Sequence, residues 1–351
     1  MQIGVITPRP HLRCCVTGER HYLTRVLETL RDAQDADRFV MFCPEEDRAS
    51  YPGWVTVPMR APGAAERLGA LVGRGPFAKT IARAQVDMLF APLEMAPAAA
   101  PVPMSVYVLD TWPWEPPRES GIPPTSVRHA RRACQEARAI VVPSEYTRRR
   151  CLELFDAPLD KMVVAPPGVS RHYAQPHESI VAPPYIIVLG ATCPSQNHSR
   201  VLAACENLAG DIPHTLVVMG EACHAEPGAW PAHVVRIERC PNAQRAGLFQ
   251  HAAAVVLPVL HEGSGIDALD VLCAGAVIIA PKVGAIPEVA GNAPVYYNHE
   301  SAESLRRTLR RVLEEPPTTP AERQRSAKRA IDYSWERCAW RVAAAFKKTA
   351  G

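Results

Sequence analysis

Long apolar runs are missing from this sequence. No stretch of 18 consecutive apolar residues occurs among the 351, so we expect no helix that spans a membrane. The first ten residues, MQIGVITPRP, lack the basic start and the long apolar stretch of a secretory signal peptide. We therefore expect a cytoplasmic protein.

Paired cysteines and a strong charge of one sign are also missing. The eleven cysteines form no C-x-x-C pair, which favours reduced, buried thiols over a disulfide framework or a common zinc site. A net charge of +3 is too small to indicate nucleic acid as a partner. Apolar residues, at 47%, are abundant beside 21% charged residues, and this composition is typical of a globular protein.

The first half of the chain alternates β-branched apolar runs with helical patterns. A helix is expected over residues 21–33 and another from residue 125 to the last strand of this half. The expected strands cover residues 3–7, 38–43, 86–92, 104–110 and 139–144. This alternation predicts a parallel sheet that is covered by helices.

A second α/β series follows a proline-rich stretch at residues 166–184, the best linker candidate in the chain. Its expected strands cover residues 185–190, 214–220, 233–238, 254–259 and 276–281. The chain is therefore predicted to form two Rossmann-like, doubly wound domains. Ligands of such sheets bind at the carboxyl ends of the strands, so we expect a binding crevice between the domains.

The last predicted helix has one apolar stripe that needs a partner surface. This stripe contains Ile331, Trp335, Cys338, Val342 and Phe346. We expect three parts in the chain: an N-terminal domain over residues 1–172, a C-terminal domain over 173–332 and a closing helix over 333–351.

The stretch HEGSGIDALD, residues 261–270, is the strongest candidate for a functional site. It places an acid, a short glycine-rich bend and two further acids directly after an apolar run. A metalloprotease helix would need a second histidine at the fifth position, where Gly265 stands, so this metal interpretation fails. Two interpretations are left: a sugar-nucleotide site, or an acid that stabilises the start of a helix.

Four segments, in order along the chain, resemble the family 4 retaining glycosyltransferases, which have the GT-B fold of two Rossmann-like domains. The likeness covers most of the chain from about Asp110 onward. The segments are VVPSEYTRRRCLELFDAPLDKMVVAPPGV, YIIVLGATCPSQNHSRVLAAC, AAAVVLPVLHEGSGIDALDVLCAGAVIIAPKVGAIPEVAG and YSWERCAWRV. In this fold the last of them is a helix that crosses back to the N-terminal domain.

The resemblance implies that a nucleoside diphosphate sugar binds to the C-terminal domain. Glu262 stands at the first acid of the family's pair and would accept hydrogen bonds from hydroxyls of the donor sugar. Asp270 stands at the second position, usually glutamate, and would bind the ribose. Gly190 would bring a second loop close to the diphosphate.

The glycine bend fits phosphate binding because it leads into a helix that begins near Ile266. Backbone N–H groups and the positive end of the helix dipole would attract phosphate oxygens there. The bend consists of Gly263, Ser264 and Gly265.

The diphosphate loop departs from the family pattern. The family commonly carries an arginine and a lysine there, and Ser195 and Gln196 stand at the matching positions. Gln196 and Asn197 are candidate donor ligands in this loop. Arg200 and Lys282 are the nearest candidate cations for the diphosphate, the alternative being solvated surface residues.

The N-terminal domain departs in a similar way. Leu109 stands where many members carry a histidine, whereas Asp110 is retained. Asp110 and Glu262 are therefore the candidate catalytic residues. Trp112 and Trp114 would stack on an acceptor sugar, the alternative being a proline-stiffened apolar loop.

The function implied by the resemblance is transfer of a hexosyl-type sugar from a nucleoside diphosphate sugar to an acceptor hydroxyl, with retention of configuration. This chemistry needs no cofactor, no metal and no protein nucleophile. The acceptor, a glycan, a lipid-linked molecule or a small molecule, is not specified by the sequence. The alternative is a catalytically degenerate GT-B protein that serves as a binding or partner subunit, which the residues at positions 109, 195, 196 and 270 favour.

Basic clusters at residues 128–132 and 148–150 are candidates for contact with an anionic membrane surface or an acidic acceptor. The alternative is that both are solvated helix faces. Assembly into a homo- or hetero-oligomer is compatible with the sequence.

Overall fold

A computed structural model divides the chain into two units. Unit 1 contains Met1–Pro166 together with Trp335–Gly351, and unit 2 contains Pro167–Ser334. The division therefore falls at Pro166 and Ser334, beside the sequence-based boundaries after residues 172 and 332. The structure describes residues 1–8, 16–33, 38–59, 76–97, 99–115, 125–190, 197, 200, 201, 203, 204, 213–220, 234–314 and 319–351.

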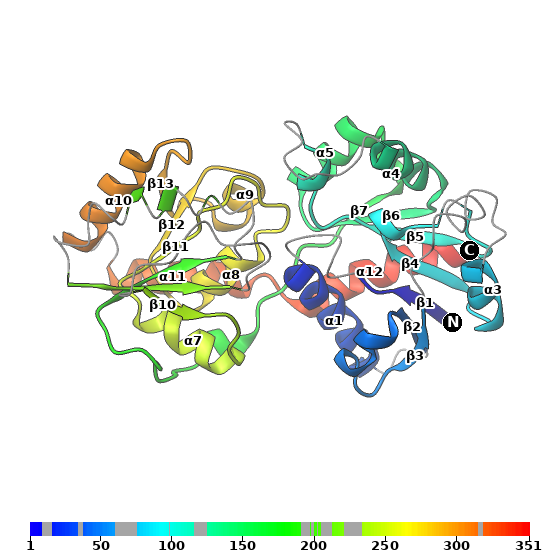
Figure 1. Ribbon diagram of the computed structural model, residues 1–351, viewed down its shortest axis with the longest axis horizontal. Coiled ribbons are helices and arrows are strands. Elements are labelled where there is room, and N and C mark those ends of the chain that lie inside the picture. Colours follow the sequence, from blue (N-terminus) through cyan, green and yellow to red (C-terminus); the bar gives the residue numbers. More distant parts are fainter. Residues whose placement is uncertain are drawn as a thin grey trace. The chain divides into compact units, whose positions relative to one another are not determined.

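Unit 1 is built on a parallel sheet with the strand order β3-β2-β1-β4-β5-β6-β7 (Figure 1). Its strands are β1 (Gln2–Ile6), β2 (Arg38–Cys43), β3 (Val55–Pro58), β4 (Met88–Pro92), β5 (Met104–Tyr107), β6 (Ala139–Val142) and β7 (Met162–Val164). The central strands β4, β5 and β6 are buried throughout, because helices cover both faces, and all their residues except Ser105 and the hydroxyl of Tyr107 are apolar.

Helices cover both faces of this sheet. Those described in unit 1 are α1 (Val16–Asp32), α3 (Pro76–Arg83), α4 (Thr125–Glu136), α5 (Glu145–Phe155) and α12 (Trp335–Ala350). Alternate strand residues point to opposite faces, so Leu89 and Val106 pack with α4 and α5 while Phe90 packs against α12. Helix α5 begins at an N-cap serine: Ser144 Oγ accepts a hydrogen bond from the N–H of Thr147 at 3.0 Å.

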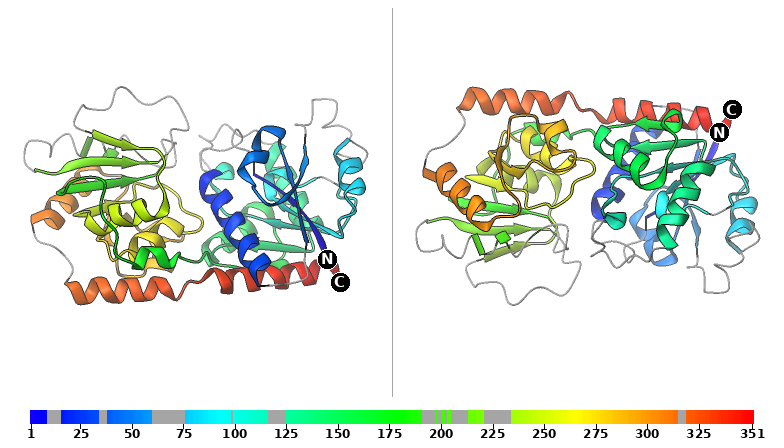
Figure 2. Two further views of the ribbon diagram at one scale, coloured as in Figure 1. Left: turned by 90° about the horizontal axis from the view of Figure 1, so that it is seen from below. Right: turned by 90° about the horizontal axis from the view of Figure 1, so that it is seen from above.

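The last helix, α12, completes the core of unit 1. It lies beside α1 in both views of Figure 2, and the Cys338 thiol contacts the Tyr22 hydroxyl at 3.3 Å. Farther along, the Phe346 ring lies 5.0 Å from the Phe90 ring, edge to face. The prediction that the closing helix packs on the N-terminal domain is therefore confirmed.

The predicted closing helix is not continuous. Helix α11 (Pro320–Ile331) ends before a turn at residues 332–334, and α12 starts at Trp335. Ile331 was expected on the buried stripe, but its side chain is 46% exposed, because the turn removes it from the helical register of α12. Trp335, Cys338, Val342 and Phe346 are buried as predicted.

Unit 2 repeats the design with the order β10-β9-β8-β11-β12-β13 (Figure 1). All its pairs are parallel. The strands are β8 (Tyr185–Leu189), β9 (Thr215–Met219), β10 (Val234–Ile237), β11 (Ala254–Val256), β12 (Ile278–Pro281) and β13 (Val295–Tyr297). The described helices are α7 (Asn242–His251), α8 (Ile266–Cys273), α9 (Ile286–Ala290), α10 (Ala302–Glu314) and α11.

The proline-rich stretch after Pro166 belongs to unit 2 rather than to an extended linker. It contains the short helix η6 (Arg171–Ala174), whose Tyr173 is buried and stacks on Phe249 of α7 at 5.9 Å. Among the described residues, no helix combines the length and apolar character required to cross a bilayer.

Removal of the Phe346 ring tests how far unit 1 depends on α12. We expect Phe346→Ala to lower the free energy of unfolding by about 3–5 kcal/mol, because the substitution leaves a cavity in a fully buried core. Denaturant unfolding followed by circular dichroism measures this change. The control is Trp340→Ala on the same helix: that side chain is 72% exposed, so the loss should stay within about 0.5 kcal/mol. Equal losses for the two variants would contradict the assignment.

Candidate functional site

The carboxyl ends of β8 and β11 bring two loops of unit 2 to one place. These strands are neighbours in the sheet, although the chain continues from β8 to β9 on the other side. A sheet whose connections diverge in this way leaves room for a ligand beyond the strand ends. Gly190 follows β8 with a φ of 130°, a value that favours glycine, and the candidate acid stretch follows β11.

One oxygen of the Glu262 carboxylate closes the glycine bend in front of α8. Oε1 accepts hydrogen bonds from the backbone N–H groups of Ser264 at 3.0 Å and Gly265 at 2.7 Å, and from the Ser264 hydroxyl at 3.0 Å. Ser264 Oγ in turn accepts a hydrogen bond from the N–H of Ile266 at 3.3 Å. These contacts lie in the bend, before the first helical residue Ile266, and they fix the Glu262 side chain relative to the bend.

The N–H groups that the sequence assigns to phosphate are thus engaged within the bend. Those of Ser264 and Gly265 donate to Glu262, and that of Ile266 donates to Ser264. The sequence interpretation treated a sugar-binding acid and phosphate-binding amides as separate features, whereas the structure joins them. A phosphate at the start of α8 would therefore compete with an anion that the chain itself supplies.

Two glycines allow the loops of the corner to pack closely. Gly265 has a φ of +71°, and a Cβ there would lie 2.5 Å from a methyl group of Val289 on α9. Gly284, after β12, has a φ of +58°, and its Cβ would lie 2.0 Å from the carbonyl oxygen of Glu262. The same carbonyl accepts a hydrogen bond from the N–H of Ala285 at 2.8 Å. The backbone of Glu262 is therefore held from the β12 side as well.

Asp270 lies in a buried ionic cluster rather than at the surface of the corner. Its side chain is 10% exposed and lies 3.9 Å from the guanidinium of Arg245 on α7. The same guanidinium nitrogen donates to Asp267 at 2.6 Å. The carboxylate faces Arg245 and Tyr173 inside unit 2, and the assignment of Asp270 to the donor ribose stays a prediction.

The environment of Asp270 favours its neutral form. Burial raises the pKa of this carboxyl group to about 7, although Arg245 acts to lower it. The neighbouring carboxylate of Asp267 raises the pKa further, and a hydrogen bond with Tyr173 lowers it. Two acids thus share one arginine, and burial makes Asp270 hold its proton more tightly than an ordinary carboxyl group does.

The candidate cations both have partners in unit 2. Arg200 donates to the carbonyl oxygen of His299 and to the side chain of Asn197, each at 3.2 Å. Asn197 has a left-handed backbone with a φ of 48°, is buried and donates to the same carbonyl at 2.9 Å. Lys282 lies 5.0 Å from the ring centre of Tyr296. Ser195 and Gln196 lie outside the described residues.

In unit 1, the segment after β5 carries the remaining candidates. The Asp110 carboxylate accepts a hydrogen bond from the N–H of Trp112 at 2.7 Å, and Leu109 is buried. For Trp114 the structure favours the apolar-loop alternative over stacking on an acceptor: the residue is 3% exposed and its ring packs edge to face on Phe155 at 5.2 Å. Trp114 is therefore a core residue, because its indole fills the space between this segment and α5. Trp112 is only partly buried.

Sequence reasoning missed the side chains that hold these candidates in place. They are Tyr173, Arg245 and Asp267 in unit 2, and Glu115 and Arg150 in unit 1. Nothing in the sequence pairs residues so far apart. Among the described residues, no group of three or more histidine, cysteine, aspartate or glutamate side chains is placed to hold a metal ion.

Substitution of Gly284 tests the close approach of the two loops. We expect Gly284→Ala to lower the thermal unfolding midpoint of unit 2 far more than Gly275→Ala, because only the first adds a methyl group against the backbone of Glu262. Gly275 is a matched control: its φ is +71°, and a Cβ there would meet nothing within 4 Å. The strain at a positive φ alone should cost about 1–2 kcal/mol. Equal shifts in the two variants would refute this packing.

The raised pKa of Asp270 predicts a pH-dependent stability. The folded chain binds this proton more tightly than the unfolded chain, whose carboxyl has its ordinary pKa of 3.8. The stability that this proton contributes is therefore complete below about pH 4 and is lost as the pH rises to about 7. Across this window Asp270 should lower the free energy of unfolding by up to about 1.4 kcal/mol per pH unit. The Asp270→Asn variant should lack this decline. Unfolding by urea at pH 5 and pH 8 measures it. Parallel pH profiles of the two proteins would contradict the prediction.

Two family models match adjacent parts of the chain. The model described as Glycosyltransferase Family 4 matches residues 21–173, and the model described as Glycosyl transferases group 1 matches residues 171–332. The first corresponds to most of the first 166 residues of unit 1, and the second to most of unit 2.

Two curated relatives are mannosyltransferases. The O-antigen chain mannosyltransferase B of Escherichia coli is 20% identical in an alignment of 249 residues, and the match covers 64% of this chain and 65% of the relative. The MMP alpha-(1->4)-mannosyltransferase of Mycolicibacterium hassiacum is 24% identical in an alignment of 235 residues, and the match covers 63% of this chain and 57% of the relative. The chain thus spans less than two thirds of the length of each.

Solved structures with the same fold cover nearly the whole chain. Sucrose-phosphate synthase from Thermosynechococcus elongatus has a TM-score of 0.76 at 14% identity, covering 99% of this chain and 98% of that one. HepE from Anabaena, in complex with UDP-glucose, has a TM-score of 0.74 at 13% identity, covering 99% of both chains. With two family models matching residues 21–332 in order, the chain belongs to the group 1/family 4 glycosyltransferases and has their GT-B fold of two Rossmann-like domains.

Proposed function

We propose that the protein transfers a hexosyl group from a nucleoside diphosphate sugar to an acceptor hydroxyl, with retention of configuration. The observation that carries the proposal is the match of both family models to a chain whose acid and glycine bend lie at the switch point of the second sheet. Switch points of such sheets are where nucleotides bind.

The donor would bind beside the start of α8. Glu262 is held by Ser264 and Gly265 through Oε1, so its carboxylate has a fixed position from which to accept hydrogen bonds from sugar hydroxyls. The positive end of the α8 dipole would favour the diphosphate at this place, in competition with the Glu262 carboxylate that the bend already binds. Arg200 and Lys282 are the cations proposed to neutralise it, and each would have to leave its present partner.

The proposed chemistry requires positioning more than covalent catalysis. The acceptor hydroxyl would attack the anomeric carbon from the face of the leaving diphosphate, whose phosphate oxygen takes the hydroxyl proton. The bond to the leaving oxygen breaks as the new glycosidic bond forms, so no protein nucleophile, metal or cofactor is required. The chain would contribute electrostatic stabilisation of the departing diphosphate. Asp110 and Trp112 are the proposed acceptor-side residues of unit 1.

A second function, a binding or partner subunit without turnover, is favoured by particular contacts. The N–H groups of Ser264 and Gly265 are engaged by Glu262, Asp270 faces Arg245, and the apolar Leu109 stands beside Asp110. Each of these features reduces the number of polar groups that are available to bind a donor.

Nucleotide binding and donor turnover separate the two functions. We expect GDP or UDP to bind in calorimetric titrations. Because the curated relatives are mannosyltransferases, GDP-mannose is the first donor to assay, with UDP-glucose beside it and methyl α-mannoside as the acceptor probe. Glu262→Gln should reduce turnover by about 10²–10³-fold, as expected when a preorganised polar contact is lost. Glu303→Gln is the control, because Glu303 is an exposed residue of α10 paired with Arg306.

Three results would change the assignment. Failure of both GDP and UDP to bind would overturn donor binding. Binding without turnover, unaffected by Glu262→Gln, would support the partner-subunit function. A product whose anomeric proton in NMR spectra shows the opposite configuration to the donor would overturn retention.

A further inference from the structure

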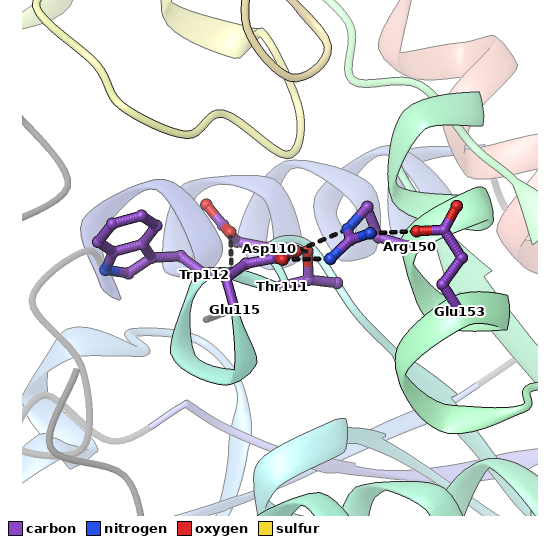
Figure 3. Close-up of polar contacts among 6 residues, drawn as sticks. All are labelled: Asp110, Thr111, Trp112, Glu115, Arg150 and Glu153. Carbon is purple, nitrogen blue, oxygen red and sulfur yellow. Dashed lines mark hydrogen bonds and ion pairs between the residues drawn. The ribbon is translucent and has the colours of Figure 1, made fainter. Parts of the chain in front are cut away.

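A tight turn follows β5 in unit 1 and is closed by its own side chains. The N–H of Trp114 donates to the carbonyl of Thr111 at 2.9 Å, and the N–H of Glu115 donates to the carbonyl of Trp112 at 3.1 Å. The Thr111 hydroxyl donates to Glu115 Oε1 at 2.8 Å. The Asp110 carboxylate accepts the N–H of Trp112, so every residue from 110 to 115 except Pro113 takes part in these bonds (Figure 3).

One arginine from α5 holds the carboxylate that closes this turn. Arg150 Nε donates to Glu115 Oε1 at 2.8 Å, and Arg150 Nη2 donates to Glu115 Oε2, so the pair is bidentate (Figure 3). The side chains are 24% and 11% exposed, respectively. On its outer side Arg150 also contacts Glu153, which is exposed. The bidentate geometry fixes the orientation of the Glu115 carboxylate as well as its position.

The same helix holds the turn at a second point. Trp114 packs on Phe155 of α5, so α5 contacts the turn through one ionic and one aromatic pair. Tyr146, at the start of α5, has its pKa raised to about 12 by burial and then by the charges of Glu115 and Asp110. The two acids of the turn therefore lie within electrostatic reach of this helix.

The ion pair between Arg150 and Glu115 is not needed to pack the turn against α5. A buried ion pair gives little net stability compared with apolar side chains of similar volume, because both charges lose their hydration. What it adds over apolar contacts is a single orientation of the turn. Figure 3 shows the Asp110 carboxylate and the Trp112 indole on this turn, with the indole directed away from the Arg150 contact.

We infer that Arg150 is a positioning residue for the acceptor: through Glu115 it fixes the turn that presents Asp110 and Trp112. This role rests on the proposed function. A carboxylate beside a partly buried indole suits a saccharide, because the carboxylate accepts hydroxyl hydrogen bonds and the ring packs on the apolar face of a pyranose. Arg150 itself, engaged by two carboxylates, acts on the acceptor only through the turn.

Hydrogen exchange of the whole protein tests the structural half of this role. We expect Arg150→Met to speed exchange of the Trp114 and Glu115 amides while amides of α8 in unit 2 keep their rates, because only the turn loses a partner. Arg148→Met is the matched control, since Arg148 lies on the same helix in an exposed pair with Glu145 at 2.8 Å. Unchanged exchange at the turn in Arg150→Met would overturn the inference.

Steady-state kinetics with GDP-mannose and methyl α-mannoside test the functional half. We expect Arg150→Met to lower kcat/KM for the mannoside by about 10²-fold, the loss typical of misplaced reacting groups, while KM for GDP-mannose stays unchanged. Arg150→Lys should recover part of this loss, because it keeps the charge without the bidentate geometry. Arg148→Met should stay within about twofold of the unchanged protein, as expected for a surface ion pair.

The outcomes separate this inference from the proposed function. A parallel loss of donor and acceptor parameters in Arg150→Met, together with a lower unfolding midpoint, would show a purely structural role and overturn the inference. Absence of transfer by the unchanged protein would count against the proposed function, and the exchange rates of the turn would still decide whether Arg150 holds it.

Discussion

Both sheets of this protein are parallel, and a parallel sheet must be covered by helices on both faces. This requirement explains why the last helix returns to the first unit: α12 covers the face of the sheet that carries Phe90, beside α1. For the same reason, each connection between parallel strands crosses one face of a sheet. The carboxyl ends of all strands therefore lie at the same edge. The candidate residues gather at these edges because the faces are already occupied by helices.

At the edge of the second sheet, close backbone packing matters more than any single side chain. Gly265 and Gly284 let two loops approach to a distance that a Cβ would prevent, and the Glu262 carboxylate then ties the bend to the start of α8. Glu262, which the proposed function assigns to the donor sugar, is therefore a structural element of this chain. The proposed role is compatible with the structural one, because three donors engage one of its oxygens and thereby orient the carboxylate.

Each unit also contains a partly buried arginine that binds an acid distant in sequence. Arg245 holds Asp267 and faces Asp270 in unit 2, and Arg150 holds Glu115 in unit 1. Such clusters contribute orientation more than stability, since desolvation offsets much of the attraction between the charges. Both arginines lie on helices, next to residues that are proposed to contact substrates. Their ion pairs therefore help to fix the positions of the segments that carry those residues.

The sequence by itself determined the alternation of strands and helices, the stripe of Trp335, Cys338, Val342 and Phe346, and the acid with its glycine bend, because these depend on local periodicity and on short motifs. It did not predict β3, β7 and β13, which are short strands at the edges of the sheets. Only the tertiary structure decided that Trp114 belongs to the core, that Asp270 faces Arg245 and that Glu115 binds Arg150. Those contacts join residues far apart in the chain, and their partners are selected by the packing of whole helices, which no local pattern encodes.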